Sequence, residues 1–231
     1  MKQSLPGRLM RAIAGSRGSI IAPLAPGWQR ERKLIAETRR KTQLLLTDPA
    51  ALHLLACVRA ASRLSGALAE AGVFKGASAR LICEEKGEKE LHLFDVFGGL
   101  QVVAPAEGEE IRAHFGPIYG SLAEVRRLLA PYPGVHLHPG IFPDTVRGLE
   151  ALRFSFVHLD MDLASSTRAA LEFFRPRMVA CGILLIDDYC ECYVKDTVDN
   201  WFSGRSDALV ELPWSQMMVI CQPSRSAADC E

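Results

Sequence analysis

Two apolar stretches of this chain each end in a pair of acidic residues. Arg153–Leu159 is followed by Asp160-Met161-Asp162, and Gly182–Ile186 is followed by Asp187-Asp188. About one helix of sequence separates the two stretches, which is the spacing of parallel strands joined by a crossover. The carboxyl ends of such strands meet at one sheet edge, where open α/β sheets keep their binding sites. The pattern predicts an α/β sheet with acids gathered at one edge.

Carboxylates brought this close together raise one another's pKa unless a cation lies between them. A cluster of oxygen ligands alone suits a hard divalent ion such as Mg²⁺. The acidic pairs therefore predict a metal site at this edge.

Strand-like and helix-like segments alternate along the chain, which predicts a doubly wound, Rossmann-like parallel sheet. The expected strands are 67–73, 90–96, 135–138, 153–159 and 182–187, and the expected helices are 78–86, 121–129, 144–152, 167–174 and 193–202. Only Pro213-Trp214-Ser215-Gln216 separates 208–212 from 217–221, so these two short strands form an antiparallel C-terminal hairpin. Trp201, Phe202 and Trp214 are interpreted as packing residues.

The N-terminal part of the chain differs from the rest in charge. The first 41 residues hold ten Lys/Arg and two Glu, a balance of +8, whereas the remainder carries −8. We expect a basic arm over 1–43, a solvated tail, followed by a domain over 44–231. Within that domain, 44–66 contains a capping helix that begins at Thr47-Asp48-Pro49, and 67–231 is the α/β core.

Composition and cysteine usage narrow the classes of protein. The formal net charge is zero, which gives no overall reason to expect nucleic acid. No stretch predicts a membrane span or an export signal. The seven cysteines are an odd number without paired spacing, so a reducing, cytoplasmic location is expected.

Two other metal sites were weighed against the carboxylates. Cys190-Glu191-Cys192 lacks a second Cys/His pair for the four ligands that zinc usually takes. His136 and His138 alternate on a short strand that ends at Pro139, and ligation there is the less favoured interpretation. His158 lies inside an apolar strand, where a core histidine is favoured over a catalytic one.

The turn after the first strand, Glu70–Ser78, carries glycines that let the backbone approach a ligand closely. It lacks the fingerprints of dinucleotide and P-loop sites, so a ligand without phosphates fits it better. Asp95 ends the second strand, where nucleoside sites place an acid that accepts hydrogen bonds from ribose hydroxyls. A turn or cap residue is the alternative for Asp95.

Five segments in order resemble the macrocin O-methyltransferase family, which contains class I S-adenosylmethionine-dependent, metal-dependent sugar O-methyltransferases. The resemblance covers about 42–221. Its segments are Glu70-Ala71-Gly72-Val73-Phe74-Lys75-Gly76, Phe94–Leu100, Gly140-Ile141-Phe142-Pro143-Asp144-Thr145, His158–Thr167 and Asp187-Asp188-Tyr189. Two positions depart from the family pattern, because Ala164 replaces a Tyr and Gly98 replaces a Glu.

The resemblance implies a role for each site residue. The cofactor S-adenosylmethionine would lie against Glu70, Gly72, Gly76, Ser78, Asp95, Ser121, Gly140, Ile141, Phe142 and Asp160. Asp160, Asp187 and Asp188 would hold the metal, and Asp162 would be the general base. The 116–121 loop would lie near the cofactor or form a lid.

The expected function is methyl transfer to a hydroxyl of a small molecule, a sugar or a glycosylated natural product. Two alternatives remain. One is a non-catalytic accessory protein that binds the same cofactor. The other is a haloacid-dehalogenase-like phosphohydrolase, because Asp160-x-Asp162 resembles the acidic motif of that class. Family enzymes often associate through their N-terminal helices, so a homo-oligomer is expected.

Overall fold

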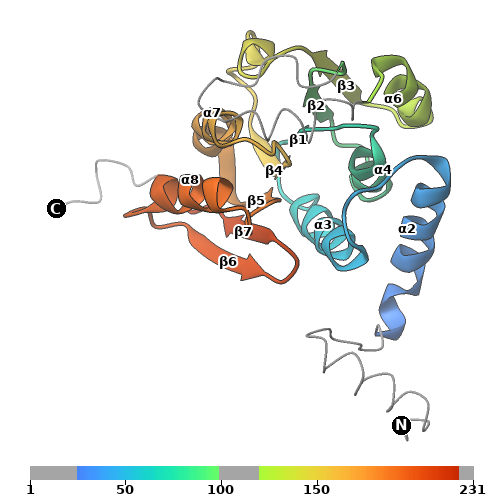
Figure 1. The fold of residues 1–231 in the computed structure, drawn as a ribbon, viewed down its shortest axis with the longest axis horizontal. Coiled ribbons are helices and arrows are strands. Elements are labelled where there is room, and N and C mark those ends of the chain that lie inside the picture. The colour runs from blue at the N-terminus through green and yellow to red at the C-terminus, as the bar shows by residue number, and fades with distance from the viewer. Residues whose placement is uncertain (1–24, 99–119, 224–231) are drawn as a thin grey trace, which may run out of the picture.

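The computed structural model describes residues 25–98 and 120–223 and contains one seven-stranded sheet (Figure 1). The strand order is β3-β2-β1-β4-β5-β7-β6. The strands are β1 (Ala67–Ala71), β2 (Leu91–Asp95), β3 (Val135–Pro139), β4 (Phe154–Leu159), β5 (Met178–Ile186), β6 (Ala208–Leu212) and β7 (Gln216–Ile220). The first five are parallel, and β7 pairs antiparallel with both β5 and β6. The predicted fold class is confirmed.

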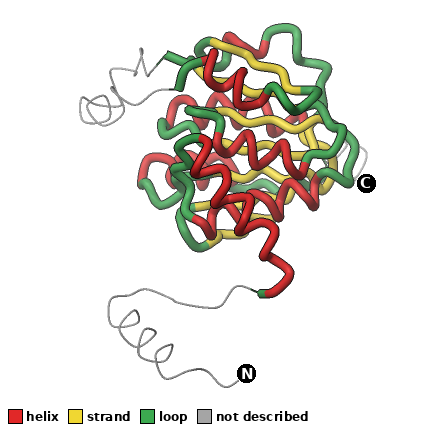
Figure 2. The backbone as a smooth tube through the Cα atoms, turned by 90° about the vertical axis from the view of Figure 1, so that its right-hand side faces the viewer, coloured by secondary structure: helices red, strands yellow, loops and turns green. Residues whose placement is uncertain are grey.

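Helices cover both faces of this sheet (Figures 1 and 2). They are α2 (Gln29–Lys41), α3 (Asp48–Ala61), α4 (Ala77–Glu85), α6 (Leu122–Leu129), α7 (Ala164–Phe174) and α8 (Cys192–Phe202), with short 3₁₀ turns at Pro26–Trp28, Asp144–Val146 and Arg175–Arg177. Successive strand residues point to opposite faces. Leu68 thus belongs to the core under α2, α3, α4 and α6, whereas Ala69 belongs to the core under α7 and α8. No helix of the described residues is long and apolar enough to cross a membrane.

One predicted helix does not form. Only Asp144–Val146 of the expected 144–152 segment is helical, as a single 3₁₀ turn. Gly148 adopts a φ of 86°, outside the helical region, which ends any continuation. Val146 is buried, and Leu149 and Leu152 pack against the same core. The apolar spacing in 144–152 therefore reflects a loop whose apolar side chains are packed against the core, and it does not indicate a helix.

The start of α3 follows the sequence expectation. Thr47 is the N-cap, and its side-chain oxygen accepts a hydrogen bond from the amide of Ala50 at 3.3 Å. Pro49 lies in the first turn, where its missing N–H costs nothing. The helix that results buries Leu54, Leu55 and Val58 against the sheet.

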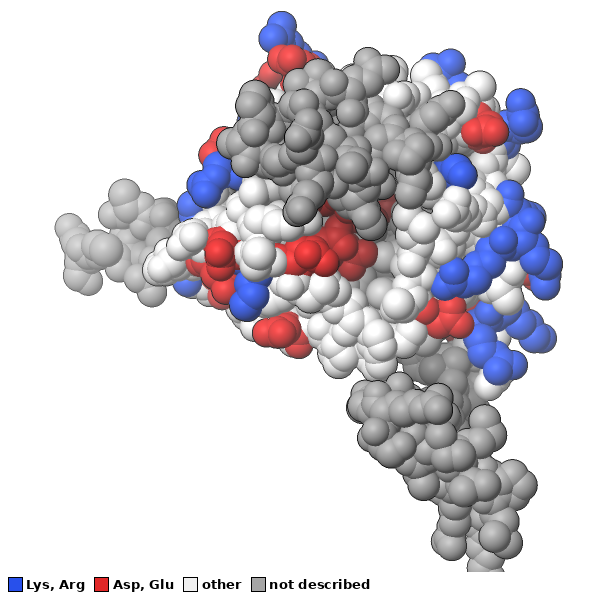
Figure 3. Space-filling view, in the orientation of Figure 1, with Lys and Arg blue, Asp and Glu red and all other residues white. Residues whose placement is uncertain are grey.

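The expectation of a solvated tail is wrong for part of the basic segment, because 29–41 forms the packed helix α2. Leu34 and Ile35 of α2 are buried in the core that α3 and α4 share. The carboxylate of Glu31 is buried too, and it accepts a hydrogen bond from Arg59 of α3. Figure 3 shows Lys and Arg concentrated on the side of the molecule where Figure 1 places α2. Residues 1–24 lie outside the described residues, and the division of the chain at residue 43 stays a prediction.

We expect α2 to contribute to the stability of the domain. Ile35→Ala should lower the free energy of unfolding by about 2–5 kcal/mol, because it removes a buried side chain and leaves a cavity. Lys33→Ala on the exposed face of the same helix is the control and should change it by less than about 0.5 kcal/mol. Urea denaturation of the full chain measures both. Equal stabilities would mean that α2 does not belong to the cooperative unit.

Candidate functional site

A cavity of about 550 Å³ opens at the carboxyl edge of the sheet. The edge is divided where the strand order reverses, since the chain proceeds outward from β1 to β3 and then returns to β4. Open α/β sheets bind their ligands at such a switch point. The cavity is lined by Leu45, Leu46, Thr47, Ala50, Gly72, Phe74, Phe94, Asp95, Val96, Gly120, Gly140, Ile141, Phe142, Asp160, Met161, Asp162, Leu163, Ser166, Asp187, Asp188, Trp214 and Ser215.

The turn after β1 passes directly over the end of β4. Gly72 has a φ of 87°, and a Cβ at this position would collide with the main-chain oxygen of Asp160. The turn is then fixed by Asp95, whose Oδ2 accepts hydrogen bonds from the amides of Val73 and Phe74, each at 2.8 Å. Asp95 Oδ1 accepts a third from the amide of Phe97 at 2.8 Å. Asp95 thus organises the turn and also faces the cavity.

The structure brings most of the predicted cofactor residues to one cavity. Those that line it are Gly72, Asp95, Gly140, Ile141, Phe142 and Asp160. Glu70, Gly76, Ser78 and Ser121 do not line it: Glu70 is fully buried, Gly76 caps α4, Ser78 lies within α4, and Ser121 caps α6. Of the predicted 116–121 lid loop, only Gly120 and Ser121 are described, and Gly120 lines the cavity. The assignment of these ten residues to the cofactor stays a prediction.

The four aspartates converge as the two acidic pairs predict. One carboxylate oxygen each of Asp160, Asp162 and Asp188 lies within 4.8 Å of the others. Strand alternation would send Asp160 and Asp162 to opposite faces, but β4 ends at Leu159. Asp162 and Asp188 both take the left-handed conformation, with φ of 59° and 56°, so that the chain turns and all four carboxylates face the cavity.

These carboxylates repel one another in a site that is largely shielded from water. Burial, followed by the charge of Asp188, raises the pKa of Asp162 to about 8. Burial raises the pKa of Asp187 to about 6, although the charge of His158 opposes it. Burial and the neighbouring carboxylates raise the pKa of Asp160 well above its usual range. No Lys or Arg of the described residues forms an ion pair with any of the four.

The residues present fit a divalent cation. Oδ2 of Asp188 is buried without a hydrogen-bond partner among the described residues. An ion between the carboxylates would satisfy such an oxygen and offset the repulsion. Asp160, Asp187 and Asp188 are the proposed ligands, and Asp162 stands beside them.

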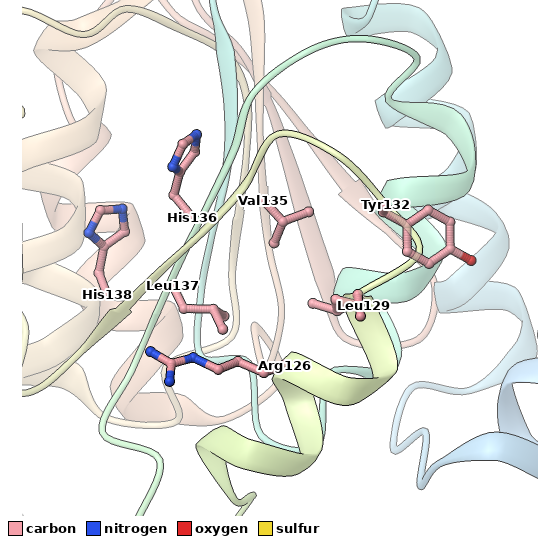
Figure 4. Close-up of a pocket in the computed structure, with 8 residues that line it drawn as sticks. Arg126, Leu129, Tyr132, Val135, His136, Leu137 and His138 are labelled. Atoms are coloured by element: carbon pink, nitrogen blue, oxygen red, sulfur yellow. The ribbon is translucent and has the colours of Figure 1, made fainter.

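The other metal candidates gather no ligand set within the described part of the chain. The two groups of closely spaced ligand atoms there contain neither Cys190 nor Cys192. The ring of His136 pairs with the carboxylate of Glu90. The ring of His138 stacks on Phe94, and its Nε2 lies 3.0 Å from Nδ1 of His92. A second hollow of about 460 Å³ runs along β3 and α6 between these histidines, Arg126 and Tyr132 (Figure 4).

Sequence reasoning missed part of the cavity wall. Trp214, expected to pack in the core, is 46% exposed and lines the cavity at the turn between β6 and β7. Ser215 in the same turn binds the loop after β5. Its main-chain oxygen accepts a hydrogen bond from the amide of Tyr189 at 2.9 Å, and its Oγ accepts one from the amide of Cys190 at 3.0 Å. Leu45 before α3 also lines the cavity and is 64% exposed. The position of Trp214 in a four-residue hairpin turn was the sequence feature that could have indicated its exposure.

The structure also locates two residues expected to pack in the core and the two positions that differ from the family pattern. Phe202 is buried and Trp201 packs against the same core, as expected. Ala164 begins α7 directly after the Asp162 turn, so the missing Tyr leaves that position small. Gly98 is the last described residue before a segment outside the described residues.

The chain was compared with known proteins. Residues 50–213 match the model of the macrocin O-methyltransferase (TylF) family. A curated relative from Streptomyces olivaceus, 8-demethyl-8-(2,3-dimethoxy-alpha-L-rhamnosyl)-tetracenomycin-C 4'-O-methyltransferase, is 32% identical over 168 residues, which cover 66% of this chain and 64% of the relative. The match thus spans less than two thirds of that relative's length.

Solved structures share the fold. The O-methyltransferase NovP superposes with a TM-score of 0.66 at 22% identity, over 75% of this chain and 79% of NovP. The SAH-bound Podospora anserina methyltransferase PaMTH1 superposes with a TM-score of 0.55 at 14% identity, over 97% of this chain and 98% of PaMTH1. At these identities the likeness shows the fold alone. Because the family model spans most of the chain, the chain belongs to the macrocin O-methyltransferase family.

Proposed function

We propose that the protein is an S-adenosylmethionine-dependent O-methyltransferase that acts on a hydroxyl group of a sugar in a glycosylated natural product. The observation that carries this proposal is a single cavity with two unlike parts. Over β1 and β2 it is lined by backbone and apolar side chains, and over β4 and β5 by four carboxylates. Family membership and the sugar O-methyltransferase activity named for the Streptomyces relative support it.

The part of the cavity over β1 and β2 suits a nucleoside linked to an amino acid. Gly72 and Gly120 line this part with backbone, and their missing side chains let the chain pass close to Asp160 and Phe74. Phe142 and Ile141 offer apolar surface for a flat base. Asp95 Oδ1 accepts one amide bond, which leaves it acceptor capacity toward ribose hydroxyls. The SAH-bound neighbour PaMTH1 has the same fold.

The opposite part of the cavity suits the acceptor. Trp214 and Leu45 expose apolar surface beside the carboxylates of Asp187 and Asp188. An indole face packs well against the C–H face of a sugar ring or an apolar aglycone. The acceptor would then present a polar hydroxyl to the acids while its apolar body lies on this rim.

When bound, S-adenosylmethionine supplies the methyl group and a divalent ion such as Mg²⁺ lowers the pKa of the acceptor hydroxyl. Asp162 would accept the proton of the acceptor hydroxyl during methyl transfer. Burial raises the pKa of Asp162 in the metal-free protein, and a cation held nearby would lower it again. Asp160, Asp187 and Asp188 would hold the ion.

Two accompanying inferences complete the proposal. We place the enzyme in the cytoplasm, where free cysteines such as Cys57 and Cys83 stay reduced. We also infer a homo-oligomer, because family enzymes associate through N-terminal helices and α2 presents one here. Incubating the full chain with labelled S-adenosylmethionine, Mg²⁺ and a panel of glycosylated acceptors tests the activity. Cofactor binding without transfer to any acceptor would favour a non-catalytic accessory protein.

Asp162 and Asp160 should respond differently to substitution. Asp162→Asn should lower kcat by about 10²–10⁴, the usual contribution of a general base, with metal affinity nearly unchanged and no rescue by Mg²⁺. Asp160→Asn is the matched comparison and should regain part of its activity at high Mg²⁺, because it weakens a ligand. Steady-state kinetics over a Mg²⁺ series measures both. Rescue of Asp162→Asn by Mg²⁺ would show that the roles are exchanged.

Trp214 should determine acceptor affinity. Trp214→Ala should raise the KM for a glycosylated acceptor by about 10-fold or more, since it removes about 1–3 kcal/mol of apolar contact, and should leave S-adenosylmethionine affinity unchanged. Trp214→Phe, which keeps an aromatic face, should retain most of the affinity. An unchanged acceptor KM in Trp214→Ala would remove this residue from the acceptor site.

Metal binding should stabilise the protein increasingly as pH rises. A carboxyl whose pKa is raised by folding, such as Asp162, favours the folded state less as pH rises from its unfolded value near 4 toward 8. The melting temperature in chelator should therefore fall between pH 6 and pH 8. Added Mg²⁺ should raise it more at pH 8, by about 2–4 °C for each kcal/mol. A Mg²⁺ effect that is equal at both pH values would contradict binding at these carboxyls.

A further inference from the structure

A fully buried histidine and glutamate lie directly beneath the carboxylate cluster. Glu70 of β1 and His158 of β4 are register partners in the parallel sheet, and both side chains are 0% exposed. Nδ1 of His158 lies 2.8 Å from Oε1 of Glu70. Because a carboxylate can only accept, this hydrogen bond places the proton on Nδ1 of His158.

The other ring nitrogen of His158 is left without a hydrogen-bond partner. Nε2 is buried and makes no hydrogen bond to any described residue. With the Nδ1 proton held by Glu70, a neutral imidazole presents a lone pair at Nε2. A buried polar atom left in this state costs about 1–3 kcal/mol. The fold therefore keeps a nitrogen acceptor in a place where only another bound species can use it.

Two of the acids lie close to the ring of His158. A ring nitrogen of His158 and one carboxylate oxygen each of Asp160 and Asp187 lie within 4.8 Å of one another. A direct hydrogen bond would hold such atoms about 2.7–3.2 Å apart. Two ligands on one ion, each at about 2.0–2.2 Å, are separated by up to about 4.4 Å. Nε2 makes no hydrogen bond to a described residue, and the limit of 4.8 Å brings the ring and both carboxylates within reach of a shared cation.

We propose that Nε2 of His158 binds the divalent ion together with Asp160 and Asp187, and that Glu70 is the positioning residue that orients the imidazole. Metal-binding histidines commonly donate their second N–H to a carboxylate in this way. This inference rests on the proposed metal-dependent function, and it changes which divalent ion the site is expected to prefer. A mixed nitrogen and oxygen ligand set favours Mn²⁺ or Co²⁺ over Mg²⁺, whereas oxygen ligands alone would favour Mg²⁺.

Another buried polar side chain lies close to Asp187. Gln216 of β7 is fully buried, and its presence lowers the pKa of Asp187, while its Nε2 has no hydrogen-bond partner among the described residues. Oε1 of Gln216 lies 2.9 Å from Nδ1 of His53 on α3. Buried polar side chains of β7, β4 and β1, namely Gln216, His158 and Glu70, thus accompany Asp187 at this edge of the sheet. These side chains support the ligands from behind, as outer hydrogen-bond partners of a metal site do.

Pulsed electron paramagnetic resonance of Mn²⁺ bound to the untagged full chain tests the nitrogen ligand directly. We expect imidazole ¹⁴N coupling in the wild type and its loss in His158→Gln. The control is His136→Gln on β3, where an exposed histidine pairs with Glu90 outside the cluster, and it should keep the coupling. Bound Mn²⁺ without ¹⁴N coupling in the wild type would overturn the proposal, as would coupling that persists in His158→Gln.

Two further variants guard against a folding defect, since His158→Gln leaves Glu70 buried without its partner. Glu70→Gln keeps the imidazole and should keep the ¹⁴N coupling while Mn²⁺ affinity falls by about 10–100-fold. The double variant with Gln at both positions removes the buried charge and should bind Mn²⁺ without coupling. Unchanged Mn²⁺ affinity in Glu70→Gln would contradict its positioning role.

The outcomes separate this inference from the proposed function. Methyl transfer with wild-type protein whose Mn²⁺ shows only oxygen ligands would leave the function standing and remove His158 from the metal. Nitrogen coupling in a protein that methylates no acceptor would leave the metal site standing and remove the function.

Discussion

The parallel pairing of β4 with β5 is the constraint on which the site depends. Leu159 lies opposite Ile186 in this register, so both strands end at the same height. The next residue on each strand, Asp160 and Asp187, therefore emerges beside the other whatever the rest of the chain does. A slip by one residue would reverse the faces of a whole strand, and the apolar residues of both strands oppose such a slip by their burial. The core thus fixes where the charges meet.

The cofactor and metal parts of the cavity are joined through the backbone. Gly72 passes so close to Asp160 that no side chain fits between them, and Asp95 then fixes the turn that Gly72 begins. The turn after β1 and the end of β4 are therefore in contact through main-chain atoms alone. A methyl donor over that turn and a metal ion at the proposed acids would be held at a defined separation, which in-line transfer requires.

The sequence predicted the parts of the site that follow from strand ends. Asp160, Asp162, Asp187 and Asp188 converge because each follows an apolar strand, and that pattern is local. Trp214 was misjudged because its environment depends on β7 pairing beside β5, a contact between distant segments. The 144–152 segment was misjudged because apolar periodicity reports burial, and Gly148 decides against the helix. The cofactor role of Glu70 stays a prediction; what the sequence did not indicate is that Glu70 is fully buried and pairs with His158.

The four aspartates at the cavity and the buried Glu70–His158 pair differ in how their charges can be compensated. Four carboxylates facing a cavity can share a cation from solvent, and their raised pKa values in its absence record the repulsion that the cation offsets. Glu70 has no such access, because it is fully buried, and it depends on His158 for a partner. Burial lowers the pKa of His158, but its hydrogen bond with Glu70 and the charges of Glu70 and Asp187 raise it overall. The carboxylates around His158 thus favour positive charge at its ring, which a bound proton or a metal ion can supply. A metal ion bound at Nε2 would replace the second ring proton that these carboxylates favour.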